Sequence, residues 1–333
     1  MSVKVSISVT TYNQEKYIEQ TLESLLMQIA NFDFEILIND DASSDKSQDI
    51  IRQYEEKYPA IIKPIYQREN QYSQGKEVHY TFNYTRAQGK YIAYCDGDDY
   101  WTDPLKLQKQ FDFMESHSHV SACVHAGKAV NEKGTRILWT QRADQKNTYL
   151  NTGKVISSQG MFASNSLFMR NYFTGDYKVP DWFHEAKITD YPLYLILSTK
   201  GDLYYMDDIM CSFRVASNGS FTQVVLNDPN RKKTHLYEMI DLLESFNQAT
   251  NSLYEKEISD QIKHNLYDYV STDINVIKSN PEEFQQLYDL VPLKMKMKLN
   301  ARYYVPGAVR FLKKVKEPIV MVFKPKEEFF IES

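Results

Sequence analysis

The sequence predicts an α/β protein with an open, mostly parallel central sheet, helices on both faces of the sheet, and a helical C-terminal extension. Strand and helix patterns alternate four times with short connections over residues 1–95, which is typical of parallel strands joined by crossover helices. After about residue 222 the pattern changes to long, charged amphipathic helices. We therefore expect an α/β domain over residues 1–222 and a helical region over residues 223–333.

The period of the apolar residues assigns each element. Alternating or continuous apolar runs predict strands over residues 3–9, 34–38, 61–66 and 91–95. Apolar residues spaced three or four apart predict helices over residues 18–29, 50–58, 78–87 and 105–114. Farther along, we expect a hairpin from 121–130 and 135–139, strands over 166–170 and 202–206, and helices over 188–198, 232–251 and 253–277.

Composition excludes several classes of protein. The chain has 333 residues, of which 42% are hydrophobic, so it can bury a sizeable core. Its net charge of −5 gives no general attraction to nucleic acid. The three cysteines include no CxxC pair, so we expect core residues in a reducing cytoplasm rather than disulfides or a zinc site. No signal-peptide pattern and no apolar run of membrane-spanning length are found in the sequence, which also favours a cytoplasmic location.

Polar clusters follow three of the predicted strands. They are Thr10–Asn13, Asp40–Asp41 and Asp96–Asp99. In open α/β sheets ligands bind beyond the carboxyl ends of the strands, where these clusters would meet. Each cluster alone is also explained by a turn or a helix cap. Their combination favours a ligand site.

The cluster Asp96–Asp99 has the composition of a cation site. It places three carboxylates within four residues, and hard cations such as Mg²⁺ or Mn²⁺ bind carboxylate oxygens and bridge to phosphates. Gly97 lets the backbone turn and a ligand approach. In the first cluster, Tyr12 offers a ring that could stack on a nucleobase. Neither a dinucleotide-binding fingerprint nor a P-loop is present in the sequence.

With these motifs, residues 1 to about 222 resemble the family 2 inverting glycosyltransferases, which have the GT-A fold. The resemblance rests on the segments VSISVTTYN (5–13), INDDAS (38–43) and GKYIAYCDGDD (89–99). The continuation YWTDPLKLQKQ (100–110) is similar to the subgroup that makes bacterial surface polysaccharides such as capsule. The resemblance implies a nucleotide-binding half over residues 1–100 and an acceptor-binding half over residues 101–222.

The same resemblance implies roles for individual residues. Tyr12 would lie on the uracil, Asp41 would read the base edge, and Asp96 would bind the ribose or the water shell of the metal. The full set of implied nucleotide-binding residues is Thr10, Tyr12, Asn13, Asp41, Asp96 and Arg214. Asp98 would bind a divalent Mn or Mg ion on the diphosphate. Arg214 suits either the diphosphate or a structural ion pair.

The catalytic base of such enzymes is a carboxylate at the start of a helix in the second half of the domain. Asp190 matches that place, and Asp181 and Glu185 are its competitors. Trp101 and Trp182 could stack on acceptor sugars, with a place in the core or an interface as the alternative for each.

The function that these features predict is metal-assisted, inverting transfer of a sugar from a nucleotide-sugar donor, with UDP favoured, to a glycan or lipid-linked glycan. The alternatives are a nucleotidyltransferase that makes sugar nucleotides and a non-catalytic sugar-nucleotide-binding protein. The tail over residues 300–333 carries seven basic residues between Arg302 and Lys326, against one acid. It fits either a docking segment or a peripheral contact with the inner face of an anionic membrane. The helices after residue 222 are open to acceptor binding or to subunit contacts in an oligomer.

Overall fold

The computed structural model describes residues 3–159, 162–174, 177–186, 190–215, 228–272 and 281–297. Contacts between residues divide the chain into two units, 1–261 and 262–333. The sheet and every strand end that carries a polar cluster lie in the first unit. The boundary expected near residue 222 falls in the segment 216–227, outside the described residues, and stays a prediction.

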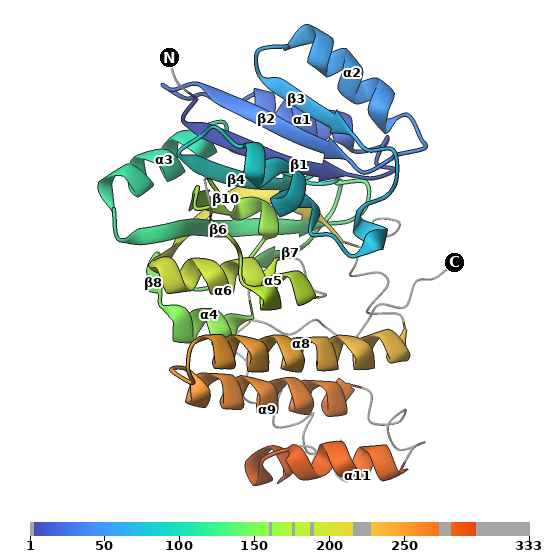
Figure 1. The fold of residues 1–333 in the computed structure, drawn as a ribbon, viewed down its shortest axis with the longest axis vertical. Helices are drawn as coiled ribbons and strands as arrows, with labels where there is room; N and C mark the ends of the chain where they lie inside the picture. The colour runs from blue at the N-terminus through green and yellow to red at the C-terminus, as the bar shows by residue number, and fades with distance from the viewer. Residues whose placement is uncertain are drawn as a thin grey trace. The chain divides into compact units, whose positions relative to one another are not determined.

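A ten-stranded mixed sheet runs through the first unit (Figure 1), in the order β3-β2-β1-β4-β9-β6-β10-β5, with β7 beside β6 and β8 beside β10. The strands are β1 Val5–Thr11, β2 Phe34–Asp40, β3 Ile62–Tyr66, β4 Tyr91–Asp96, β5 Tyr100–Trp101, β6 Val120–Val130, β7 Ile137–Gln141, β8 Thr148–Leu150, β9 Phe168–Arg170 and β10 Asp202–Arg214. Strands β1 to β4 are parallel, as are β6 and β10. The short strand β9 pairs antiparallel with both β4 and β6 and so joins the two parallel parts.

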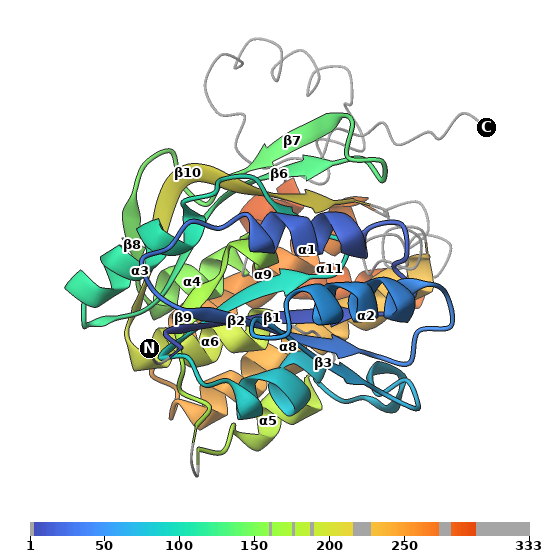
Figure 2. The ribbon, with the colours of Figure 1, turned by 90° about the horizontal axis from the view of Figure 1, so that it is seen from above.

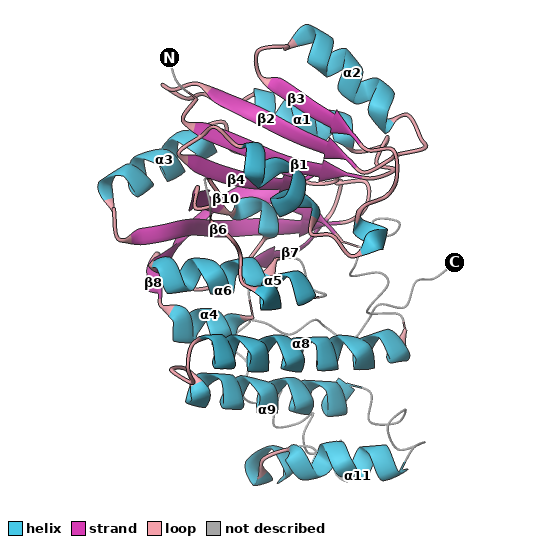
Figure 3. Cartoon of the chain, in the orientation of Figure 1, coloured by secondary structure: helices cyan, strands magenta, loops and turns pink. Residues whose placement is uncertain are grey.

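Helices flank this sheet and make up the C-terminal region, as Figure 3 shows by colour. They are α1 Ile18–Leu26, α2 Ser47–Lys57, α3 Lys106–Ser116, α4 Thr152–Ser158, α5 Asp181–Glu185, α6 Tyr191–Lys200, α8 Pro229–Ala249, α9 Glu255–Thr272 and α11 Pro281–Leu290. The predicted α/β fold class and the helical C-terminal region are confirmed. The elements β5, β8, α4, α5 and α11, most of them short, were not predicted.

Strand β1 is buried on both faces. Its apolar residues Ile7 and Val9 join the core formed with α1 and α2, and its polar residues Ser6 and Ser8 are equally buried. Figure 2 shows α1 and the segment around residue 80 on opposite sides of β1. The alternation of apolar and polar residues thus separates an apolar core from a buried polar layer.

The segment that covers this polar layer is not the α-helix predicted over residues 78–87. It forms a π-helical turn, His79–Asn83, followed by a 3₁₀ turn, Tyr84–Arg86. Asn83 Nδ2 donates hydrogen bonds to Val9 O at 2.9 Å and to Ser8 Oγ at 3.0 Å, so its side chain fastens the turn to β1. Such polar bonds to the sheet favour the wider turn over regular helix, and π-turns often occur at functional sites.

All three cysteines are free and buried, so their expected place in the core is confirmed. Among the described residues, no helix combines the length and apolar character needed to cross a membrane. The basic tail over residues 300–333 lies outside the described residues.

Candidate active site

The loop Asp96–Asp99 joins β4 to β5 and is fixed by hydrogen bonds of its backbone. Asp99 N donates to Asp96 O at 3.1 Å, which closes a four-residue turn, and Gly97 N donates to Thr10 O at 2.8 Å. The Thr21 hydroxyl of α1 lies at 2.9 Å from Gly97 O and 2.6 Å from Asp99 O. The loop is therefore positioned before any ligand binds.

Gly97 has no room for a side chain. A Cβ atom at this position would lie 2.7 Å from Thr11 Cβ and would also clash with Gln14 Oε1. We expect Gly97→Ala to shift the loop and to cost about 1–3 kcal/mol of folding free energy. Urea unfolding would measure the folding stability. Titration with UDP would measure the loss of affinity expected when the carboxylates of the loop are displaced. An equally stable variant with unchanged UDP affinity would contradict this role for Gly97.

Arg214, at the end of β10, also holds the loop Asp96–Asp99 in place by hydrogen bonds. Its Nε donates to Glu132 O at 3.0 Å, and its two terminal nitrogens donate to Asp98 O and Gln20 Oε1. Its backbone N–H donates to Asp99 Oδ1 at 3.1 Å. The side chain is buried, and the guanidinium lies over the Tyr17 ring. In this structure the guanidinium is hydrogen-bonded to protein oxygens, and its expected role toward a diphosphate stays a prediction.

The three carboxylates of the loop differ in environment. Asp99 is buried, and burial, together with the charges of Asp98 and Asp96, raises its pKa well above the usual range. Asp96 and Asp98 are half-buried and so can reach a ligand. The described residues contain no group of three or more metal-binding side chains. A cation at Asp98 would therefore draw further oxygens from its ligand, as Mg²⁺ does when it binds one or two carboxylates and a phosphate.

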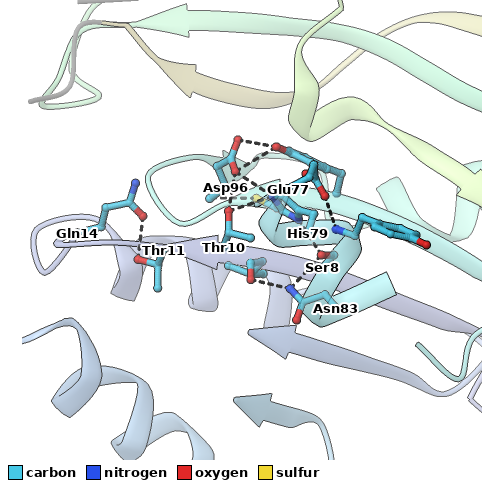
Figure 4. Close-up of polar contacts among 12 residues, drawn as sticks. Ser8, Thr10, Thr11, Gln14, Glu77, His79, Asn83 and Asp96 are labelled. Carbon is cyan, nitrogen blue, oxygen red and sulfur yellow. Dashed lines mark hydrogen bonds and ion pairs between the residues drawn. The ribbon is translucent and has the colours of Figure 1, made fainter. Parts of the chain in front are cut away.

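Asp96 lies in a polar cluster with Thr10 and His79, which Figure 4 shows, and with Tyr94. Thr10 Oγ1 and the Tyr94 hydroxyl each donate to Asp96 Oδ1 at 3.2 Å. His79 Nε2 lies 3.2 Å from the same oxygen. Sequence reasoning missed His79. The polar face of β1 was the only signal for it, because a polar face that becomes buried needs polar partners.

Asp190 stands directly before α6 and is the candidate base that the structure brings to this cluster. Its carboxyl is half-buried, and burial raises its pKa to about 6, with a further contribution from the negative charge of Asp96. The two carboxylates, 94 positions apart in the chain (190 − 96), are thus electrostatic neighbours. Asp181 and Glu185 are exposed on α5.

The first two strand-end clusters meet as the topology predicts. Asp41 N donates to Thr11 O at 2.9 Å, and Asn13 Oδ1 accepts a hydrogen bond from Ser44 N at 2.8 Å. Asn13 adopts a positive φ of 53°, a conformation that asparagine tolerates better than most residues. In this structure Asn13 thus connects the two loops.

Asp41 is buried, and each of its carboxylate oxygens accepts a backbone N–H, from Gln71 at 2.8 Å and from Tyr72 at 3.0 Å. Tyr12 is 49% exposed and Tyr72 is 56% exposed, so both rings are accessible near Asp41. Tyr72 was not predicted as a site residue. Tyr72 follows a polar stretch of sequence with no strand pattern. Its position in the fold depends on the hydrogen bond that its backbone N–H donates to the distant Asp41.

The two tryptophans have different surroundings. Trp101 is 1% exposed, its Nε1 donates to Asn165 O at 3.0 Å, and Lys106 Nζ lies 3.8 Å from the centre of its ring. The expectation that Trp101 stacks on an acceptor sugar is therefore wrong, because both polar and apolar parts of the side chain are used in the core. Trp182 packs edge-on against Phe246 of α8, with ring centres 5.5 Å apart. Its acceptor role stays a prediction.

Comparison with known proteins decides the family. The model of the family "Glycosyl transferase family 2" matches residues 6–174, about half of the chain, which include β2 to β9, most of β1 and the loops that carry the three polar clusters. The chain belongs to glycosyl transferase family 2. The matched region of this family 2 protein contains Thr10, Asp41, Asp96 and Asp98 but ends before Asp190.

Curated relatives match this family 2 chain over shorter stretches. An uncharacterized protein of Mycobacterium tuberculosis is 38% identical over 132 residues, which cover 40% of this chain and 37% of that protein. The Escherichia coli protein named UDP-Glc:alpha-D-GlcNAc-diphosphoundecaprenol beta-1,3-glucosyltransferase WfaP is 37% identical over 112 residues, 34% of this chain and 41% of that protein. The matches thus span well under half the length of either relative.

Among solved structures, TarS 1–349 of S. aureus in complex with UDP is similar in fold, with a TM-score of 0.58. The alignment covers 91% of this chain and 87% of that chain at 18% sequence identity. This likeness extends beyond the region that the family model matches and supports the GT-A fold for most of the chain.

Proposed function

We propose that this protein transfers a sugar from a UDP-sugar to a hydroxyl of a glycan or lipid-linked glycan, with inversion at the anomeric carbon. The observation that carries the proposal is the pairing of Asp190 with Asp96. Burial, with a contribution from the negative charge of Asp96, raises the pKa of the Asp190 carboxyl to about 6, and Asp96 stands at the carboxyl end of β4, next to β1. A base with a pKa close to neutral is suited to accept a proton from an acceptor hydroxyl.

The reaction would be a single displacement. Asp190 accepts the proton of the acceptor hydroxyl while the oxygen attacks the anomeric carbon of the donor. The new carbon–oxygen bond forms on the face opposite to the nucleotide, the bond from the anomeric carbon to the diphosphate breaks, and UDP leaves. A divalent Mn or Mg ion bound at Asp98 would neutralise charge on the departing diphosphate.

The nucleotide site would lie beside Asp41. Tyr12 and Tyr72 offer exposed rings near a buried carboxylate, an arrangement that suits stacking on a base. Asp96 would bind a ribose hydroxyl or the water shell of the cation. The name of the E. coli relative begins with UDP-Glc, and the TarS structure is a complex with UDP. Both favour a UDP-sugar as the donor.

The E. coli relative also favours a lipid-linked acceptor, because its name specifies a diphosphoundecaprenol. Transfer to such an acceptor would take place at a membrane surface, where the basic residues 300–333 would make a peripheral contact. Trp182 remains our candidate for stacking on an acceptor sugar.

A donor panel tests the proposed function. The purified protein is incubated with Mn²⁺ and with UDP-, GDP- and dTDP-sugars in turn, and release of the nucleoside diphosphate is measured. We expect slow, metal-dependent release of UDP from one UDP-sugar in the absence of acceptor. Formation of a sugar nucleotide and pyrophosphate from UTP and a sugar phosphate would instead show a nucleotidyltransferase. Binding of UDP without turnover of any donor, even with acceptor glycans present, would show a non-catalytic protein.

A further inference from the structure

His79 is a buried imidazole that the proposed reaction does not use. It lies in the π-turn over the polar face of β1, is 4% exposed, and stacks on the Tyr94 ring with centres 4.0 Å apart. Its Nδ1 lies 2.7 Å from Ser8 Oγ, and its Nε2 lies 3.0 Å from Thr10 Oγ1 and 3.2 Å from Asp96 Oδ1 (Figure 4). Both ring nitrogens therefore have hydrogen-bond partners.

The direction of these hydrogen bonds depends on Asn83 and Asp96, which lie on opposite sides of the contacts that the ring makes. The amide orientation of Asn83 is fixed at both ends, because Nδ2 donates to Val9 O at 2.9 Å and Oδ1 accepts from Arg86 Nη2 at 3.0 Å. Nδ2 also donates to Ser8 Oγ at 3.0 Å, and the Ser8 hydroxyl keeps its own proton, which it can donate to His79 Nδ1 at 2.7 Å. On the other side of the ring, Nε2 lies 3.2 Å from the carboxylate oxygen Asp96 Oδ1, which accepts, so the ring proton of a neutral imidazole is on Nε2 and Nδ1 is the acceptor.

The two oxygens of Asp96 differ as a result. Oδ1 has three protein partners, Thr10, His79 and Tyr94. Among the described residues, Oδ2 accepts a hydrogen bond only from the Tyr94 hydroxyl, at 3.2 Å. A carboxylate oxygen has two lone pairs, so Oδ2 retains capacity for a ligand hydroxyl or a metal-bound water.

We propose that His79 is a positioning residue for the nucleotide-sugar. The relay from Asn83 through Ser8, together with Asp96, fixes the Nε2–H tautomer of His79, and His79 with Thr10 holds Asp96 by Oδ1 so that Oδ2 faces the donor. The inference rests on the proposed function and extends it, since it assigns the donor-facing oxygen and the group that orients it. His79 itself does not touch the reacting atoms.

Three substitutions of His79 separate the stacking of its ring from the hydrogen bonds of its two nitrogens. His79→Phe keeps a ring for stacking on Tyr94 but removes both nitrogens. His79→Gln offers an amide N–H near the position of Nε2, whereas His79→Asn offers one near Nδ1. His117→Phe is the matched control, because this imidazole also stacks on a ring, that of Phe113 at 4.0 Å, but directly follows α3 and, in the part of the chain that the structure describes, makes no hydrogen bond to the polar cluster.

We expect His79→Phe to raise the donor KM and the UDP dissociation constant about tenfold or more, the effect of losing a hydrogen bond to a charged group. The kcat should change less than KM. His79→Gln should recover most of the affinity and His79→Asn should not, while His117→Phe should match the wild type. A residue that only fills space would give the opposite order, with Phe tolerated best.

The tautomer gives a second readout that does not depend on activity. In the ¹⁵N NMR spectrum of the full chain labelled at histidine, we expect the His79 signals of a ring that carries its proton at Nε2, and Ser8→Ala should weaken this preference. A wild-type ring protonated at Nδ1 alone would overturn the inference, and so would unchanged UDP affinity in a folded His79→Phe variant. Failure of the proposed function is distinguishable, because the wild-type protein would then neither bind UDP nor cleave any donor.

Discussion

Replacing Asp190 with Asn is expected to lower sugar transfer by a factor of about 10² to 10⁴, the usual contribution of a general base. The amide has nearly the shape of the carboxyl but cannot accept the acceptor proton at neutral pH. Affinity for UDP should stay close to that of the wild type, since Asp190 acts on the acceptor rather than on the nucleotide. Steady-state transfer rates and UDP titration by calorimetry measure the two quantities separately.

Asp181→Asn and Glu185→Gln are matched controls for this experiment. Both residues come from the same part of the chain, but their side chains are exposed on α5. We expect both variants to transfer sugar at rates near wild type. Full activity of Asp190→Asn, together with loss of activity in either control, would move the role of base to α5.

The pH dependence of sugar transfer tests the role of Asp190 as the base independently. Burial raises the pKa of Asp190 to about 6, and the base works only when it is deprotonated. The value of kcat/KM should therefore be low below pH 6, rise through about pH 6 and level off above it, since this profile reports the free enzyme. In the residual activity of Asp190→Asn this rise should be absent.

Much of this site could be predicted from the sequence because strand ends are local features. Three of the four strands predicted in the first 95 residues end in a polar cluster, and parallel topology brings such ends to one edge. Asp190 was predicted from the family resemblance instead, because it stands at the start of a helix in the second half of the domain. Its burial and its proximity to Asp96, which both raise its pKa, are properties of the folded chain alone.

The residues that sequence reasoning missed or misjudged depend on distant partners. His79 bonds to Ser8 across 71 positions, and Arg214 donates to the carbonyl of Asp98 across 116. Trp101 follows the acidic loop as a site aromatic would, yet Ser24 Oγ accepts its backbone N–H and draws this part of the chain into the core. No local sequence pattern distinguishes a buried polar layer from a solvated strand face. The turns over residues 79–86, which cover that layer, could therefore not be predicted either.

Within the acidic loop, Asp98→Asn is expected to weaken Mn²⁺-dependent binding of UDP by at least about 100-fold, more than the loss typical of a residue that only supports a metal ligand. The loop should keep its shape, because Arg214 donates to the backbone carbonyl of Asp98, which the substitution leaves in place. Calorimetric titration of UDP with and without Mn²⁺ measures the effect. Binding without metal should change little.

Asp99→Asn is the closest available control, since it removes a carboxyl from the same loop. Burial and the neighbouring charges raise the pKa of Asp99 well above its usual range, so the native group is already inclined to be neutral, and an amide oxygen can accept the Arg214 N–H in its place. Mn²⁺-dependent binding should therefore survive in Asp99→Asn. If binding instead survived in Asp98→Asn and disappeared in Asp99→Asn, the buried carboxyl would be the metal ligand, and the loop would have to open for the cation to enter.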